Sequence, residues 1–180
     1  MSQEIFNCYI ESLIKRVPKF EDPVYIECLH NIYDMFKSVS FTEVLNHGDY
    51  HLGKTIITNG NTLYILDWEK AFIGDPRYDI AHTLVLGYSW FGTSFKEPML
   101  DAYQNITNKR IEHLDCFEAL SSFDSFTKMV PLIEGADDSP IRDRTFEWLM
   151  RRYELFVRHN GKRINAAEEY LLSKCVPFKL

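Results

Sequence analysis

Residues 47–67 read HGDYHLGKTIITNGNTLYILD, and this stretch decides the structure around it. Two segments rich in β-forming residues, 54–58 and 62–66, are separated by an Asn-Gly-Asn turn, which is the pattern of a β-hairpin. A hairpin folds the chain back on itself, so Asp49 before it and Asp67 after it should lie close together. The sequence therefore predicts a pair of carboxylates at one end of a small β element.

The residues around these carboxylates indicate what the pair can do. Gly48 permits a sharp turn that presents Asp49 on a loop. A hydroxyl that accepts a phosphoryl group needs such a carboxylate to orient it and to take its proton. The Mg²⁺ that accompanies nucleotide phosphates prefers carboxylate and carbonyl oxygens, and Asp67 offers them at the end of an apolar strand. His47 and His51 flank Asp49, and we expect them to fix the loop by hydrogen bonds rather than to bind a metal.

The composition narrows the class of protein. Of the 180 residues, 46% are hydrophobic and 14% aromatic, as in a globular protein with one sizeable core. The formal net charge of −6, without a long run of Lys or Arg, argues against nucleic-acid binding. The cysteines form no CxxC pair and are interpreted as reduced thiols. Because the sequence has neither a signal-peptide pattern nor a long apolar segment, we predict a soluble, cytoplasmic protein without a membrane partner.

Apolar residues recur at helical spacing through most of the chain. The predicted helices cover approximately residues 3–16, 23–39, 79–87, 95–106, 110–130, 139–159 and 165–175. Residues 67–78 are expected to be irregular. Residues 131–140 are expected to form a solvated acidic loop, with a site for a cationic substrate as the alternative for 134–138. No repeat or linker marks a boundary, so the predicted fold is mostly α with a small β-hairpin (α+β), in a single domain of residues 1–180.

Three motifs in order, HGDYHLG at 47–53, ILDWE at 65–69 and GDPRYDIA at 74–81, resemble the aminoglycoside phosphotransferase-like family. That family includes choline kinases and is distantly similar to protein kinases. The resemblance is strongest over residues 41–90, and it implies the C-terminal catalytic and substrate lobe of a protein-kinase-like fold. It also implies transfer of the γ-phosphate of ATP or GTP to a hydroxyl of a small molecule, such as an aminoglycoside or choline, with Mg²⁺.

The same resemblance implies a role for each matching carboxylate. Asp49 would be the catalytic base, with His47 beside it in the catalytic set, and Asp67 would be the Mg²⁺ ligand. Asp79 would be the buried carboxylate that braces the His-Gly-Asp loop from the start of the next helix. From its position before an apolar helical stretch alone, Asp79 is interpreted as a helix N-cap.

Two features depart from the family pattern. His51 and Lys54 fall in the cofactor-binding part of the motif, but the family has Asn at position 54 as a second metal ligand. An ammonium has no acceptor, so Lys54 would lie beside Asp67 as a substitute cation or contact a phosphate oxygen; the remaining alternative is a solvated lysine at the strand edge. Residues 1–40, predicted to be helical, carry no Gly-rich strand pattern, so the family's N-terminal nucleotide lobe is expected to be absent.

These departures leave a second class of function open, a catalytically silent, pseudokinase-like lobe that binds a ligand or regulates a partner. An apolar face left bare by the absent lobe would favour a homo-oligomer or a partner chain. A metallophosphoesterase is disfavoured, because dinuclear sites need further His, Asp and Asn ligands than this sequence offers. Two groups of residues are given no part in the chemistry. The aromatic residues interpreted as core residues rather than substrate platforms are Trp68, Tyr78 and Trp90, and the histidines given structural roles are His30, His82, His113 and His159.

Overall fold

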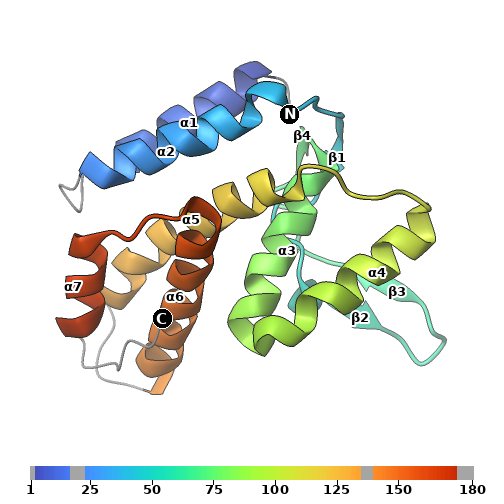
Figure 1. The fold of residues 1–180 in the computed structure, drawn as a ribbon. Helices are drawn as coiled ribbons and strands as arrows, with labels where there is room; N and C mark the ends of the chain where they lie inside the picture. The colour runs from blue at the N-terminus through green and yellow to red at the C-terminus, as the bar shows by residue number, and fades with distance from the viewer. Residues whose placement is uncertain (1–2, 17–22, 135–139, 174–180) are drawn as a thin grey trace.

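The structure is a computed structural model that describes residues 3–16, 23–134 and 140–173 (Figure 1). Within these residues the helices are α1 (Gln3–Arg16), α2 (Pro23–Met35), α3 (Pro76–Phe91), α4 (Lys96–Thr107), α5 (Leu114–Glu134), α6 (Pro140–Asn160) and α7 (Asn165–Ser173). The strands are β1 (Val44–Asn46), β2 (Thr55–Ile57), β3 (Leu63–Ile65) and β4 (Phe72–Gly74). They form two antiparallel pairs, β1 with β4 and β2 with β3. The predicted class, mostly α with a small β part, is confirmed.

The two N-terminal helices bury the apolar stripes that the sequence predicted for them. On α1 the buried residues Phe6, Ile10 and Leu13 follow the i, i+4, i+7 spacing of one helix face. α2 ends earlier than predicted, because its last turn tightens into a 3₁₀ helix at Phe36–Ser38. The two helices lie side by side along one edge of the molecule (Figure 1).

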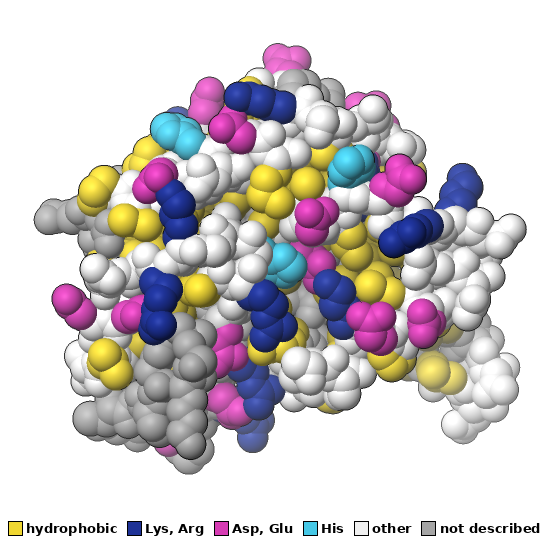
Figure 2. All heavy atoms as spheres, viewed as in Figure 1, with side chains coloured by type: hydrophobic (Ala, Val, Ile, Leu, Met, Phe, Trp, Pro, Cys, Tyr) yellow, Lys and Arg dark blue, Asp and Glu magenta, His cyan; other side chains and the backbone are white. Residues whose placement is uncertain are grey.

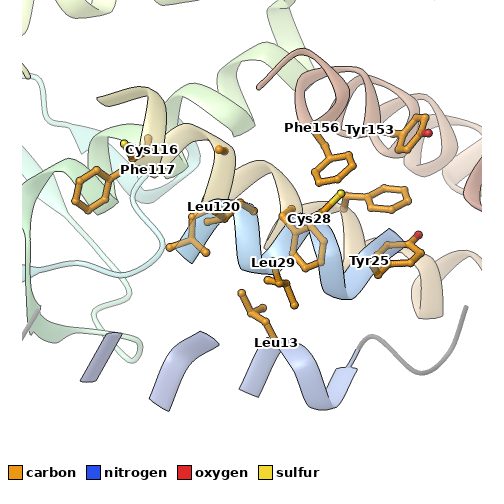
Figure 3. Close-up of a cluster of buried hydrophobic side chains, with 14 of the residues drawn as sticks. Leu13, Tyr25, Cys28, Leu29, Cys116, Phe117, Leu120, Tyr153 and Phe156 are labelled. Carbon is orange, nitrogen blue, oxygen red and sulfur yellow. The ribbon is translucent and has the colours of Figure 1, made fainter. Parts of the chain in front are cut away.

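The main core lies where α5 packs against α6 and α3. Aromatic rings dominate it: the Phe126 ring lies 5.1 Å from that of Tyr153 and stacks on Tyr25 from α2, centroid to centroid 6.3 Å. Figure 3 shows side chains from α1, α2, α5 and α6 gathered in this core. Each large apolar side chain buried in this way contributes about 1.5–3 kcal/mol. The packing of α3 against α5 and α6 fixes the position of α3.

The predicted hairpin is confirmed, with strands of three residues each. β2 pairs with β3 in the register Thr55↔Ile65 and Ile57↔Leu63. The turn is closed by the Thr58 N–H, which donates to the Thr62 carbonyl at 3.0 Å. The large apolar side chains of this hairpin are exposed, and that of Ile57 reaches 70%. No described part of the chain covers them.

The pairing of β1 with β4 was not predicted. Residues 67–78 were expected to be irregular, but the register Val44↔Gly74 and Asn46↔Phe72 places part of them in a sheet. Strands of three residues carry no measurable period, and this pairing depends on tertiary packing rather than on local pattern. The pair brings the chain before the His-Gly-Asp turn beside the chain that leads into α3.

The start of α3 also differs from the prediction. The helix begins at Pro76, and Asp75 is its N-cap, accepting the Arg77 N–H at 3.0 Å. The interpretation of Asp79 as the N-cap is therefore wrong, and Asp79 lies in the first turn. Its carboxylate is thereby free of the capping role and reaches the neighbouring loop.

Two further predicted boundaries are wrong. α3 does not end at Gly87 but continues to Phe91, and the Phe95 ring packs where a Cβ at position 87 would lie. Residues 131–134 belong to α5 rather than to the acidic loop. The remainder of the predicted loop, residues 135–139, lies outside the described residues.

The surface carries both positively and negatively charged side chains (Figure 2). Figure 2 shows basic and acidic side chains interspersed with apolar ones over one face of the molecule. No helix in the described ranges is long and apolar enough to cross a membrane.

Candidate active site

A sharp turn follows β1 and presents the first of the two carboxylates. Gly48 has a φ of +80°, a region that favours glycine. A Cβ at this position would collide with the carbonyl oxygen of Lys70. Glycine therefore serves both the turn and the close approach of the segment after Asp67.

We expect Gly48→Ala to lower the free energy of unfolding by about 1–3 kcal/mol, because alanine adds backbone strain and a steric collision at this turn. Urea unfolding followed by circular dichroism measures the change. Gly60→Ala is the matched control, since the nearest atom to a Cβ there is Thr58 Oγ1 at 4.0 Å. Equal stability of the two variants would contradict the role given to Gly48.

Asp79 holds the turn from α3. Its Oδ2 accepts the His47 N–H at 2.6 Å and its Oδ1 accepts the Gly48 N–H at 2.9 Å. Thr83, one turn further along α3, donates to the Tyr50 carbonyl at 2.9 Å. Hydrogen bonds to an ionised carboxylate are stronger than neutral ones, so the loop is fixed rigidly to a helix that the core itself fixes.

The His47 side chain joins the segments of the two carboxylates. Its Nε2 donates to the Leu66 carbonyl at 2.8 Å, and its Nδ1 accepts the Asp49 N–H at 3.3 Å. This pattern corresponds to the neutral tautomer with the proton on Nε2. The ring is buried, and each of its nitrogens has a backbone partner. In this geometry His47 positions Asp49 and the residue before Asp67.

Asp49 is engaged by two further side chains. His82, from α3, lies with Nε2 3.2 Å from Oδ1, and the Lys70 ammonium donates to Oδ2 at 2.8 Å. The hydrogen bond from His82 is the largest influence on the pKa of Asp49; burial opposes it, and Lys70 adds to it. The pKa of Asp49 is held well below its ordinary value of about 3.9. Asp49 is therefore ionised at neutral pH.

Lys54 lies between the two carboxylates. It ends the short 3₁₀ helix η3 (Leu52–Lys54), which His51 caps by accepting the Gly53 N–H at 3.1 Å. The Lys54 ammonium donates to Asp67 Oδ2 and lies 3.9 Å from Asp49 Oδ2. The hydrogen bond to Asp67 is the main cause that raises the pKa of Lys54. The Lys54 ammonium thus donates a hydrogen bond to Asp67 and lies at ion-pair distance from Asp49.

The His51 ring packs against an aromatic residue of α3. It meets the Trp90 ring edge-on, with the centroids 5.1 Å apart. Burial lowers the pKa of His51, against the attraction of Asp49. His51 is therefore neutral at physiological pH and acts on Lys54 through the cap.

The donor set does not fit a magnesium site as it stands. Mg²⁺ is bound through oxygen ligands in octahedral geometry. Here Asp67 is paired with an ammonium, and the neighbouring position offers Lys54, which has no acceptor. Within the described part of the chain, no group of three or more His, Cys, Asp or Glu could hold a metal ion. The metal-binding role of Asp67 stays a prediction.

Sequence reasoning missed two of the residues that contact Asp49. His82 was interpreted as structural, although it follows Asp79 by three residues and so shares its helix face. No local pattern pointed to Lys70. The interpretation of Trp68 as a core residue is wrong, because its side chain is 44% exposed. Its indole donates to the Ile65 carbonyl at 3.0 Å and covers His47, with no described element above it.

A buried ion pair, Asp75–Arg77, fixes the start of α3. The fully buried Asp75 carboxylate accepts the Thr42 N–H at 2.8 Å and two hydrogen bonds from the Arg77 guanidinium, at 2.7 and 2.8 Å. The guanidinium also donates to the carbonyls of Ser40 and Glu112 at 2.6 and 3.1 Å. This network ties the start of α3 to the chain before β1 and to the chain before α5.

Comparison with known proteins gives one match. The model of the family described as APH, Phosphotransferase enzyme family, matches residues 5–115, which is more than half of the chain. The matched region runs from α1 to the start of α5 and includes all three motifs. No curated protein and no solved structure gives a significant match.

Proposed function

Because the chain belongs to the phosphotransferase enzyme family, we propose that it transfers the γ-phosphoryl group of ATP or GTP to a hydroxyl of a small molecule. One observation carries this proposal: an ionised carboxylate, Asp49, is held on a rigid loop with two ammonium groups beside it. Phosphoryl transfer depends on positioning and on charge stabilisation, and this arrangement supplies both.

In the proposed step the acceptor hydroxyl donates a hydrogen bond to Asp49. Its oxygen forms a bond to the γ-phosphorus while the bond from that phosphorus to the oxygen bridging the β-phosphate breaks, and the hydroxyl proton passes to Asp49. A carboxylate has about four lone-pair sites, so Asp49 can accept a hydroxyl while it keeps His82 and Lys70. Its low pKa makes it a weak base. In a loose transition state the hydroxyl loses its proton late, so orientation matters more than basicity.

The two lysines would stabilise the charge on the transferred group. Lys70 has an exposed side chain, with 57% of its surface accessible, and its ammonium can therefore turn from Asp49 to a phosphoryl oxygen. Lys54 is held more firmly, between Asp49 and Asp67. Ammonium groups fixed where negative charge develops lower the barrier to transfer.

Thermal unfolding with nucleotides tests the proposal. A ligand at 100 times its dissociation constant adds about 2.7 kcal/mol of stability, which corresponds to a rise in Tm of about 5–10 °C for a chain of this size. We expect this rise with ATP or GTP, measured with MgCl₂ and again with EDTA. AMP is the control, because it lacks the β- and γ-phosphates. A Tm that no triphosphate changes at millimolar concentration would contradict the proposal.

The surface of the hairpin favours a second candidate, a catalytically silent lobe that regulates or binds a partner. Large apolar side chains are exposed on both faces of the hairpin and on the neighbouring sheet: Leu45, Ile56, Ile57, Leu63, Tyr64, Leu66 and Ile73. A patch of this kind marks an interaction surface. A partner chain or a second copy of this chain would cover it. Absence of a nucleotide-induced rise in Tm, together with self-association in sedimentation, would favour this candidate.

The cytoplasm is the proposed location of this activity. Cys8 and Cys116 are free thiols in the structure, and Cys8 is exposed. Free thiols of this kind are typical of reducing compartments.

A further inference from the structure

We infer that the Lys54 ammonium is the resident cation of the Asp49–Asp67 pair and excludes a divalent metal ion from the space between these carboxylates. The inference rests on the proposed function only in naming this site as the phosphoryl-transfer site. It concerns the side chains of Asp49, Lys54 and Asp67 and a divalent metal ion, and it can be tested without measuring turnover.

The position of Lys54 is fixed at both of its ends. Its carbonyl accepts the Leu66 N–H at 2.8 Å, which ties its backbone to the residue before Asp67. Its own N–H donates to the His51 carbonyl at 2.8 Å, within the turn that the His51 ring caps. Its ammonium donates to Asp67. The side chain is only 21% exposed, so the ammonium is held in the site rather than solvated at the strand edge.

The charges of Asp49 and Asp67 are neutralised without an added metal ion. The two carboxylates, Asp49 and Asp67, face the two ammonium groups of Lys54 and Lys70. Glu69 is a further acidic neighbour of Lys54. A divalent ion between the carboxylates would lie against the Lys54 ammonium, and like charges in contact repel strongly in a partly buried site.

The ligand chemistry leads to the same result. Asp49 Oδ2 and Asp67 Oδ2 already accept hydrogen bonds from ammonium groups. An Asn at position 54 would offer an amide oxygen in place of a positive charge. The substitution Lys54→Asn therefore removes the internal cation and adds a ligand of the kind that Mg²⁺ and Mn²⁺ prefer.

Binding of Mn²⁺ without nucleotide tests the inference. The electron paramagnetic resonance signal of free Mn²⁺ is titrated with the full chain at neutral pH. We expect the wild type to bind no Mn²⁺ at this site and Lys54→Asn to gain one site, at least about tenfold tighter than any wild-type binding. The double variant Lys54→Asn/Asp67→Asn should lose the gained site. Lys37→Asn, which removes an exposed lysine paired with Asp34, is the matched control.

Each result decides the question. Tight Mn²⁺ binding by the wild type, equal to that of Lys54→Asn, would overturn the inference. So would a Lys54→Asn variant that is folded by circular dichroism and binds no Mn²⁺. Lys54→Gln provides the same amide oxygen on a longer side chain and replaces Lys54→Asn if that variant does not fold. A chain without phosphotransferase activity would contradict the proposed function alone, because Mn²⁺ binding is measured without substrates.

Discussion

Asp49→Asn is expected to abolish phosphoryl transfer while the fold stays intact. Asparagine has the shape of aspartate, but its amide cannot take the hydroxyl proton, and its NH₂ group would face the Lys70 ammonium or His82 instead of accepting from them. Loss of a positioned base lowers the rate by about 10²–10⁴-fold. The rate is measured with γ-labelled ATP and two acceptors, choline and an aminoglycoside.

Two controls separate chemistry from folding in this experiment. The Asp49→Asn variant should keep the wild-type far-UV spectrum and the nucleotide-induced rise in Tm, because Asp49 is on the surface of the site rather than in the core. Asp101→Asn, at an exposed position of α4, removes the same charge from a residue outside the three motifs and should leave the rate unchanged. A variant that retained more than about one third of the wild-type rate would exclude Asp49 as the base.

The largest effect on stability is expected from Asp75→Asn. The Asp75 carboxylate is fully buried and accepts from Thr42 and Arg77, and the Arg77 side chain is only 14% exposed. Asparagine keeps the N-cap of α3, but it leaves the guanidinium of Arg77 without a counter-charge. Removal of one partner from a buried ion pair costs about 3–5 kcal/mol. Urea unfolding at pH 7 measures the loss, and Asp34→Asn, from the exposed pair with Lys37, is the control that should change little.

The pH dependence of this loss identifies its cause. Burial raises the pKa of Asp75, but the hydrogen bonds from Arg77 and from the backbone of Thr42 outweigh it, so the pKa of Asp75 lies below its ordinary value. A group with a lowered pKa stabilises the folded state above its unfolded pKa, about 3.9 for Asp, and loses this contribution as the pH falls through the folded pKa. The difference in stability between wild type and Asp75→Asn should therefore be constant from about pH 5 to 8 and shrink below about pH 4. A difference independent of pH down to acid unfolding would show that packing, not charge, is lost.

The local parts of the site could be predicted from the sequence because each of them depends on a short sequence pattern. The Asn-Gly-Asn turn between two β-rich segments identifies the hairpin, and the hairpin brings Asp49 and Asp67 to one place. The helical periods predict all seven described helices, with errors confined to their ends. The motifs are specific in combination, and the family that they resemble is the one whose model matches.

Three of the errors share one physical origin, because they concern contacts between distant segments. The pairing of β1 with β4 joins strands that are too short to have a period of their own. The contact of His82 with Asp49 depends on the orientation of α3, which its packing on α5 and α6 sets. Trp68 looks apolar in the sequence, and only the arrangement of the other elements decides that nothing described covers it.

The sequence by itself determined the helical class, the hairpin and the identity of the carboxylates, because turn chemistry, periodicity and motif spacing are local. Only the tertiary structure decided that Lys70 and His82 contact Asp49. The hairpin register brings Lys54 to Asp67, as one sequence alternative expected, but Lys70 is 21 residues from Asp49 along the chain and no local rule pairs those two. Lys70 and His82 reach Asp49 because the His47 ring and Asp79 join the hairpin segment to α3, and that long-range packing sets the charge of the site.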